Sequence, residues 1–194
     1  MIRNIPNILT FSRILIVPVI IGLYIIRVDG LWLALIFIVT SFTDYLDGYL
    51  ARRLKQTSKL GAFLDPVADK IMVTVVLILL VSDSFVLDAS INSQAFIVVV
   101  TLIISREITV SALREWMAEI GQRSKVAVGT IGKLKTTSQM LAITLLLYAK
   151  DIGWFPTLKV GEVLLYIAGI LTFYSMLVYL NTAWSNFKTS NPQK

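Results

Sequence analysis

The sequence contains no cysteine and no histidine. The absence of cysteine excludes a disulfide framework, thiolate metal sites and a cysteine nucleophile. The absence of histidine excludes a Ser-His-Asp triad and any imidazole base, so proton transfer must be carried out by carboxylates or lysines. Charged residues make up only 15% of the 194 residues, with 12 acidic and 18 basic side chains. Any acid-base chemistry therefore depends on a small number of identifiable groups.

Apolar residues are abundant instead, at 56% of the chain with a mean hydropathy of +0.78. This is too apolar for an ordinary soluble domain and indicates an integral membrane protein. At about 20 residues for each spanning helix, the chain divides into six transmembrane segments preceded by a short interfacial segment at residues 2–8. The predicted fold is an all-α, six-helix membrane protein that forms a single domain over residues 1–194. The spans are residues 9–27, 31–53, 61–82, 94–116, 134–150 and 158–184.

Basic residues are distributed unevenly between the two sides of these spans. All but three of the 18 Lys and Arg residues lie on or near one side, the exceptions being Arg27, Lys150 and Lys159. Because cytoplasmic loops are enriched in Lys and Arg, both termini and the connection between the second and third spans are expected to face the cytoplasm. The net charge of +6 comes with no separate basic domain, which favours membrane lipids and phosphorylated substrates over nucleic acid as partners.

Four aspartates lie at helical spacing around the turn between the second and third spans. Asp44 and Asp47 are three residues apart, and Asp65 and Asp69 are four residues apart, so each pair lies on one helix face. Two such helices packed antiparallel bring together four carboxylates, whose mutual repulsion favours a bound divalent cation. Ligands that are all oxygen point to Mg²⁺ or Mn²⁺. There are enough oxygens for two ions, an arrangement that clamps a phosphoryl group between attacking and leaving oxygens.

This stretch resembles the signature of the CDP-alcohol phosphotransferase family. It matches the pattern D-x-x-D-G-x-x-A-R, eight residues, G, three residues, D, three residues, D at every fixed position, which are Asp44, Asp47, Gly48, Ala51, Arg52, Gly61, Asp65 and Asp69. Members of the family are integral membrane enzymes, usually homodimers, that transfer a phosphatidyl group from a CDP-linked lipid to an alcohol. The resemblance implies that the four aspartates hold two divalent ions. It also implies that Gly48, Ala51, Arg52 and Gly61 lie beside the cytidine nucleotide.

A second polar group begins in the fourth span. Arg106 and Arg114 are eight residues apart, about 12 Å along a helix axis, and an Arg at membrane depth requires a partner or a polar cavity. Lys133 and Lys135 lie at the start of the fifth span, close to a helix N-terminus that attracts phosphate. These four residues are predicted to bind an acceptor phosphate. For the two lysines, the alternative is ordinary positive-inside flanking of a span.

Three further segments are similar to the members of this family that make phosphatidylglycerophosphate in bacteria. They are IPNILTFSR at the amino terminus, R-E-I-x-x-S-x-x-R at Arg106 and G-K-x-K-T-x-x-Q at Lys133. The resemblance implies that CDP-diacylglycerol and sn-glycerol 3-phosphate are converted to phosphatidylglycerophosphate and CMP. It also favours Asn7, Thr10 and Arg13 as residues that line the site, with Asn7 and Thr10 at CDP-diacylglycerol, although Arg13 could instead extend to the lipid headgroups. The same resemblance implies the plasma membrane of a bacterium, with the active site facing the cytoplasm.

Asp69 is the predicted base that removes the proton from the acceptor's hydroxyl. It is the last acidic residue on its helix face, one turn beyond Asp65, and the resemblance assigns the same role to the aspartate at this position. Adjacent metal ions would depress its pKa, so Asp69 is also a candidate metal ligand. Lys70, which follows it, is either a charge partner inside the bundle or a substrate contact.

Three alternatives to this activity remain open at the level of sequence. The same chemistry could use phosphatidylglycerol, giving cardiolipin, or inositol phosphate as the acceptor. A membrane prenyltransferase also uses Asp pairs and Mg²⁺, but its two Asp-rich motifs usually lie far apart in the chain. A cation transporter would place carboxylates near mid-bilayer and would need no nucleotide.

Overall fold

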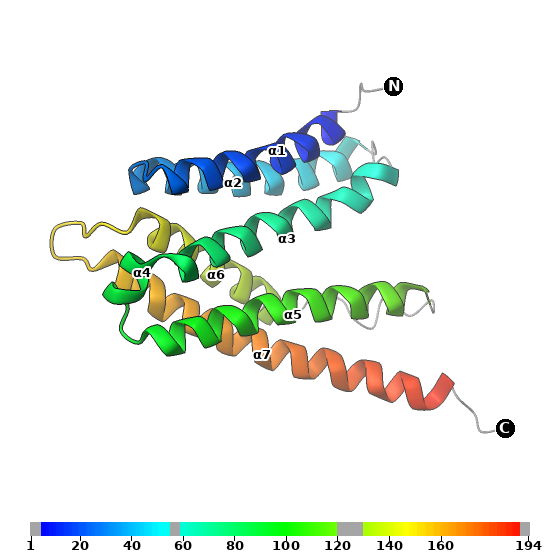
Figure 1. Ribbon diagram of the computed structural model, residues 1–194. Coiled ribbons are helices and arrows are strands. Elements are labelled where there is room, and N and C mark those ends of the chain that lie inside the picture. Colours follow the sequence, from blue (N-terminus) through cyan, green and yellow to red (C-terminus); the bar gives the residue numbers. More distant parts are fainter. Residues whose placement is uncertain (1–4, 55–58, 120–129, 191–194) are drawn as a thin grey trace.

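The protein is described here from a computed structural model that covers residues 5–54, 59–119 and 130–190 (Figure 1). Some helical residues are described by their backbone alone. The side chains outside the description are those of residues 5–11, 13, 44–54, 59–66, 69, 118–119, 130–133 and 182–190.

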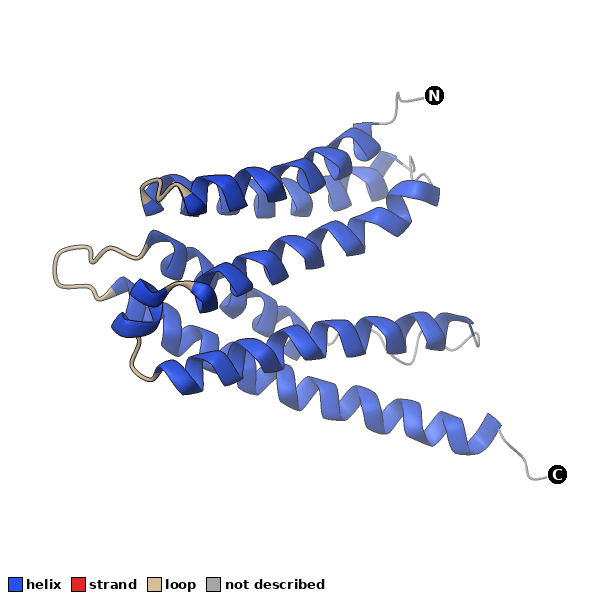
Figure 2. Ribbon diagram, viewed as in Figure 1, coloured by secondary structure: helices blue, strands red, loops and turns tan. Residues whose placement is uncertain are grey.

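The described residues form seven α-helices and no β-strand (Figure 2). An all-α fold is therefore confirmed for this part of the chain. The helices are α1 (Ile5–Ile25), α2 (Gly30–Leu54), α3 (Lys59–Ser82), α4 (Ser84–Ala89), α5 (Ser93–Glu119), α6 (Thr130–Tyr148) and α7 (Thr157–Ser190).

Each of the six long helices overlaps one of the segments predicted to span the membrane. The helix α1 begins at Ile5, so residues 5–8 of the predicted interfacial segment 2–8 belong to this helix. Two described segments are long enough and apolar enough to cross a bilayer, Ser93–Met117 in α5 and Thr157–Asn181 in α7. The apolar parts of α1, α2 and α3 are shorter, at Ile14–Ile25, Gly30–Thr43 and Lys70–Ser82. The count of six spans thus stays a prediction. The short helix α4 was not predicted, because it lies in the polar connection between two spans.

The long helices run side by side and their ends form two groups (Figure 1). The starts of α1, α3 and α6 and the ends of α2, α5 and α7 are directed towards the same side of the molecule, and we call this side the motif end because α2 and α3 carry the four aspartates there. The opposite end, which contains α4 and the connection between α6 and α7, we call the Asp83 end. Among the packed pairs, α6 lies along α7, α1 contacts α2 and α3, and α5 contacts α7 and α3.

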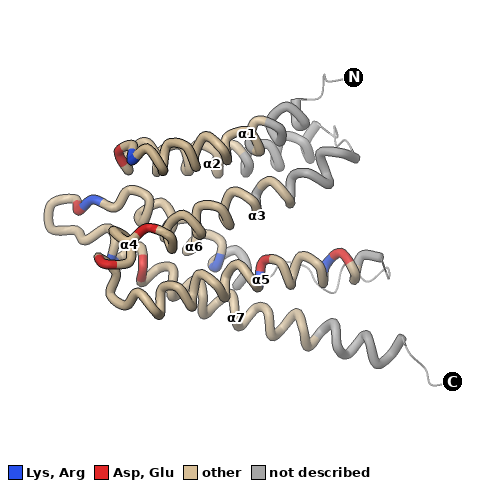
Figure 3. The backbone as a smooth tube through the Cα atoms, in the orientation of Figure 1, with Lys and Arg blue, Asp and Glu red and all other residues tan. Residues whose placement is uncertain are grey.

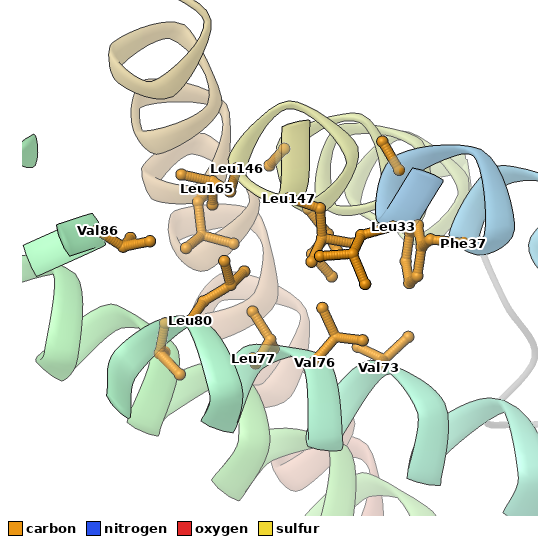
Figure 4. Close-up of a cluster of buried hydrophobic side chains, with 14 of the residues drawn as sticks. Leu33, Phe37, Val73, Val76, Leu77, Leu80, Val86, Leu146, Leu147 and Leu165 are labelled. Atoms are coloured by element: carbon orange, nitrogen blue, oxygen red, sulfur yellow. The ribbon is translucent and has the colours of Figure 1, made fainter. Parts of the chain in front are cut away.

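The core is formed by apolar side chains that converge from α2, α3, α6 and α7 (Figure 4). Phe37, Leu77 and Leu146 are each no more than 1% exposed. Two glycines allow close helix contacts. A Cβ atom at Gly30 would lie 2.3 Å from the carbonyl oxygen of Tyr148, and one at Gly169 would lie 2.7 Å from Cγ1 of Val99. Larger residues at these positions would push α2 from α6 and α7 from α5.

The outer surface is apolar, whereas several charged side chains are inside. Leu15 and Ile170 are 67% and 71% exposed, while Arg106, Lys135 and Glu162 are at most 7% exposed. This distribution is the reverse of that in a soluble protein and fits contact with lipid. Figure 3 shows the described charges gathered in two regions, with long uncharged helical stretches between them.

At the Asp83 end, one carboxylate joins three elements. Asp83 caps α4 by accepting a hydrogen bond from the backbone amide of Phe85 at 3.0 Å, and it also accepts hydrogen bonds from Tyr24 Oη at 2.8 Å and from the Arg27 guanidinium. Burial acts to raise the pKa of Asp83, but these hydrogen bonds favour the ionised form more strongly, so its pKa lies below the ordinary value. The end of α1 is thereby tied to the junction between α3 and α4.

A second carboxylate fastens α7 to the segment before α5. Glu162 is fully buried and accepts hydrogen bonds from the backbone amides of Ile91 at 2.6 Å and Asn92 at 3.2 Å, and from the hydroxyl of Tyr166. A buried carboxylate with these donors is compensated. These contacts hold the Asp83 end together at a distance from the basic residues of the motif end.

Candidate active site

The predicted metal ligands are carried by helical backbone at the motif end. Asp44 and Asp47 lie in α2, and Asp65 and Asp69 lie in α3, so the three- and four-residue spacings place each pair on one helix face. Their side chains lie outside the description. Where side chains are described, no group of three or more His, Cys, Asp or Glu residues is close enough to hold a metal.

The other predicted residues without described side chains also lie towards the motif end (Figure 1). Asn7 and Thr10 are in the first turns of α1, Lys133 is in the first turn of α6, and the residues predicted to lie beside the nucleotide flank the α2–α3 connection. The latter residues are Gly48, Ala51, Arg52 and Gly61.

Arg106 is described in full and lies inside the bundle. Its Nη2 donates a hydrogen bond to Ser175 Oγ on α7 at 3.0 Å, and its Nη1 lies 3.3 Å from Glu107 Oε1. Its Nε is buried and has no hydrogen-bond partner among the described residues. The guanidinium is therefore oriented by two neighbours and retains an unused donor.

Lys135 on α6 forms an ion pair with Glu107, and the same carboxylate oxygen is the one that faces Arg106. The side chains of Lys135 and Arg106 are 6% and 8% exposed, and that of Glu107 is 19% exposed. One carboxylate thus lies between two cations that come from different helices.

Arg114 reaches the same region through Tyr179 on α7. Its Nη2 donates a hydrogen bond to the Tyr179 hydroxyl at 2.9 Å. The Cζ atoms of Arg114 and Arg106 lie 5.2 and 5.9 Å from the centroid of the Tyr179 ring, within the range of cation–π attraction. Although eight residues separate the two arginines in sequence, a single aromatic ring contacts both of them.

Arg106, Arg114 and Lys135, together with Lys70, form what we call the basic group. Lys70 connects the other three cations to α3, the helix that bears Asp65 and Asp69. Its Nζ donates a hydrogen bond to Ser111 Oγ on α5. Ser111 lies one turn beyond Glu107 and shares its helix face with Glu107 and Arg114. Because Lys70 directly follows Asp69, the contact places the α3 backbone at the aspartate motif beside the basic face of α5. Lys70 was predicted to be either a charge partner inside the bundle or a substrate contact, and its partner in the structure is a serine hydroxyl.

The described charges of this group are strongly unbalanced. Lys70, Arg106, Arg114 and Lys135 are four cations, and Glu107 is a carboxylate in contact with two of them, Arg106 and Lys135. Buried Nε atoms of both arginines have no partner among the described residues. Among the described residues cations thus outnumber carboxylates, and guanidinium groups with unused donors are typical of a phosphate site.

The sequence profile of the CDP-alcohol phosphatidyltransferase family matches residues 3–174. The chain belongs to this family. Membership confirms the resemblance drawn from the aspartate motif, and it excludes the prenyltransferase and the cation transporter as alternatives.

Several bacterial members of the family are similar to the chain over nearly their whole length, and each is named CDP-diacylglycerol–glycerol-3-phosphate 3-phosphatidyltransferase. The relative from Pectobacterium atrosepticum is 49% identical over 185 residues, which cover 93% of this chain and 94% of the relative. The relative from Sodalis glossinidius is 47% identical over 182 residues, with 93% and 94% covered. The relative from Yersinia enterocolitica is 45% identical over 186 residues, with 94% and 96% covered.

For this family member, the donors at the aspartate motif suit the divalent metal that the family requires. Helical register puts two carboxylates on one face of α2 and two on one face of α3, and both helices bear them near the motif end. Carboxylate oxygens are the ligands preferred by Mg²⁺ and Mn²⁺. The residues present therefore fit a hard divalent ion.

Three polar residues that accept hydrogen bonds from these cations were not predicted from the sequence. Tyr179, Ser111 and Ser175 were not among the residues predicted to form the site. A signal was nevertheless present, since Thr172, Ser175 and Tyr179 are spaced by three and four residues on an otherwise apolar helix. Such a polar stripe on a membrane helix faces the bundle interior.

The structure also contains a cavity of about 630 Å³ between α5 and α7, which is separate from this chemistry. Its walls are apolar side chains such as Val99, Leu102 and Phe173, with the tyrosines Tyr166 and Tyr174 among them. None of its lining residues is a carboxylate or a cation. A phosphorylated substrate would find no charge partner there.

Proposed function

We propose that this protein is a CDP-diacylglycerol–glycerol-3-phosphate 3-phosphatidyltransferase. It would transfer the phosphatidyl group of CDP-diacylglycerol to sn-glycerol 3-phosphate, giving phosphatidylglycerophosphate and CMP. The observation that carries the proposal is the Lys70–Ser111 contact, because it joins the helix of Asp65 and Asp69 to a group of cations suited to an acceptor phosphate. Family membership supplies the reaction type, and the names of the bacterial relatives favour glycerol 3-phosphate as the acceptor.

Asp44, Asp47, Asp65 and Asp69 would hold Mg²⁺ or Mn²⁺, with room among their oxygens for two ions. When bound, such ions neutralise the diphosphate of the nucleotide lipid and the charge that develops on transfer. The residues proposed to position CDP-diacylglycerol lie on the same helix ends. They are Asn7, Thr10, Gly48, Ala51, Arg52 and Gly61.

In the proposed reaction, a free hydroxyl oxygen of glycerol 3-phosphate attacks the β-phosphorus of CDP-diacylglycerol. The new bond joins that oxygen to the phosphatidyl phosphorus, and the bond to the CMP oxygen breaks, so CMP leaves with the electron pair. Asp69 accepts the proton of the attacking hydroxyl. With no histidine in the chain, a carboxylate is the available base at this position.

The acceptor's phosphate would be bound by Arg106, Arg114, Lys133 and Lys135. Arg106 and Arg114 present unused Nε donors, and Ser175 and Tyr179 orient their guanidinium groups. A planar guanidinium can bind a phosphate through two parallel hydrogen bonds. This arrangement would fix the acceptor at one end and leave its hydroxyl directed towards the reacting phosphorus.

The position of Arg106 along α5 supports a site that opens to the cytoplasm. Residues 89–105 contain no charge, and α5 begins at Ser93, so Arg106 lies about 20 Å along the helix. The hydrocarbon core of a bilayer is about 30 Å thick. The cations would therefore lie below the membrane surface in a polar cavity. We infer six spans, one domain over residues 1–194, cytoplasmic termini in the plasma membrane, and a homodimer.

An acceptor comparison tests the proposal. The purified protein in detergent micelles is incubated with CDP-diacylglycerol and Mg²⁺, and CMP release is measured with glycerol 3-phosphate, phosphatidylglycerol or inositol phosphate. The proposal predicts rapid release of CMP when glycerol 3-phosphate is the acceptor, and slow release with the other two acceptors. Faster release with either other acceptor would reassign the substrate within the family.

A further inference from the structure

Glu107 differs from the charged residues of the basic group, because it is a carboxylate in contact with two of the cations, Arg106 and Lys135. It lies on the face of α5 that also carries Ser111 and Arg114. Its Oε1 pairs with Lys135 Nζ from α6 and lies 3.3 Å from Arg106 Nη1. The carboxylate is thus located between two of the cations proposed to bind the acceptor's phosphate.

A carboxylate oxygen in this position satisfies the same donors that a phosphate oxygen would use. Without an anion, Arg106 and Lys135 would be two like charges buried next to each other, and each would be costly to keep inside the bundle. Glu107 offsets that cost. It also repels an incoming dianion and occupies hydrogen-bonding capacity of both cations. The contacts with Glu107 that stabilise the empty site therefore oppose the binding of the acceptor's phosphate.

We propose that Glu107 is a resident counter-ion of the acceptor site. It holds Arg106 and Lys135 in place while the site is empty and competes with the phosphate of glycerol 3-phosphate for both cations, which weakens acceptor binding. Glu107 acts through the two cations and is a positioning residue. The inference rests on the proposed function, since it takes glycerol 3-phosphate as the acceptor.

The Glu107→Gln variant tests the effect of the negative charge of Glu107 while nearly preserving the shape of its side chain. Glutamine has the same length and keeps a carbonyl oxygen that can accept from Lys135 and Arg106, but it does not carry the negative charge. We expect the KM for glycerol 3-phosphate to fall about ten-fold, because a like charge next to a bound phosphate is removed. The KM for CDP-diacylglycerol should stay unchanged, since that lipid is bound by other residues.

The matched control is Glu115→Gln, which removes the same charge from an exposed residue two turns further along α5. It should leave both KM values as in the wild type. Glu107→Asp provides a second variant that keeps the charge and draws it back by one methylene group, and it should lower the KM for glycerol 3-phosphate by a smaller factor. The Asp variant carries the test if Glu107→Gln does not yield folded protein.

A binding measurement separates this inference from the proposed function. Inorganic phosphate should raise the melting temperature of Glu107→Gln at lower concentrations than it does for the wild type, and this readout needs no turnover. If the wild type fails to use glycerol 3-phosphate, the proposed function is wrong. If it does use it, and Glu107→Gln binds glycerol 3-phosphate and inorganic phosphate no more tightly than the wild type, Glu107 is a structural partner of Lys135 and the inference is overturned.

Discussion

Tyr179 allows a test of how the two arginines are held. Tyr179→Phe keeps the ring next to both guanidinium groups but removes the hydroxyl that accepts a hydrogen bond from Arg114 Nη2 at 2.9 Å. Tyr179→Leu removes the hydroxyl and the ring together. Comparison of the two variants separates the contribution of the hydrogen bond from that of the cation–π contacts.

The size of each effect follows from the contacts. A hydrogen bond to a charged group contributes about 1.5–3 kcal/mol, and because water can partly replace the hydroxyl, we take the lower value of about 1.5 kcal/mol. That corresponds to about a ten-fold increase in the KM for glycerol 3-phosphate in Tyr179→Phe. Loss of two cation–π contacts adds about 0.5–1 kcal/mol each. Tyr179→Leu should therefore raise that KM about 100-fold in total.

The assay measures initial rates against glycerol 3-phosphate at saturating CDP-diacylglycerol, with the melting temperature of each variant recorded in the same detergent. Tyr174→Phe is the control, because Tyr174 lies on the same helix and is 53% exposed; its KM should equal that of the wild type. If Tyr179→Phe and Tyr179→Leu both keep the wild-type KM, Tyr179 does not orient the arginines for the acceptor, and its contacts with them make no contribution to acceptor binding.

Four further predictions concern the metal site, the acceptor site, the base and the Asp83 end. Asp44→Asn or Asp65→Asn should abolish turnover while the protein stays folded, and equal rates in EDTA and in Mg²⁺ would contradict a metal requirement. Arg106→Lys should raise the KM for glycerol 3-phosphate and not that for CDP-diacylglycerol, because lysine lacks the bidentate fork. Asp69→Asn should lower kcat greatly while metal-dependent binding of CDP-diacylglycerol persists; if that binding is lost as in Asp44→Asn, Asp69 is primarily a metal ligand. Asp83→Asn should lower the melting temperature at neutral pH. The stability contributed by the Asp83 carboxylate is present above the ordinary Asp pKa of about 3.9 and is lost as the pH falls through its lowered folded-state pKa, so an equal loss of stability at pH 3 and pH 7 would argue against this ion pair.

Much of the architecture could be predicted because hydrophobic runs of spanning length leave few alternatives to a helix. The predicted segments 31–53 and 61–82 correspond to α2 at Gly30–Leu54 and α3 at Lys59–Ser82. The predicted spans do not determine where each helix ends. The helix α7 continues to Ser190, beyond the predicted end at residue 184, because helix formation does not stop where the apolar composition ends.

The candidate site was only partly predictable, for a physical reason. The spacing of Asp65 and Asp69 defines a helix face without reference to the rest of the chain. In contrast, the contacts Lys70–Ser111 and Arg114–Tyr179 join residues 41 and 65 positions apart. Such pairs depend on which helices become neighbours, and the sequence of a single span carries little information about its neighbours. The pairing of Glu107 with Lys135 depends on the same tertiary arrangement.

Incorporation of radiolabelled sn-glycerol 3-phosphate into lipid by the purified protein tests the central claim most directly. The reaction contains CDP-diacylglycerol and Mg²⁺, and chloroform-extractable label is measured with each component omitted in turn. Label should enter a lipid product that carries two phosphates, with one CMP released for each molecule formed, and only when the nucleotide lipid and the metal are both present. CMP release without label in the lipid fraction, or labelling that proceeds without CDP-diacylglycerol, would contradict the proposed phosphatidyl transfer.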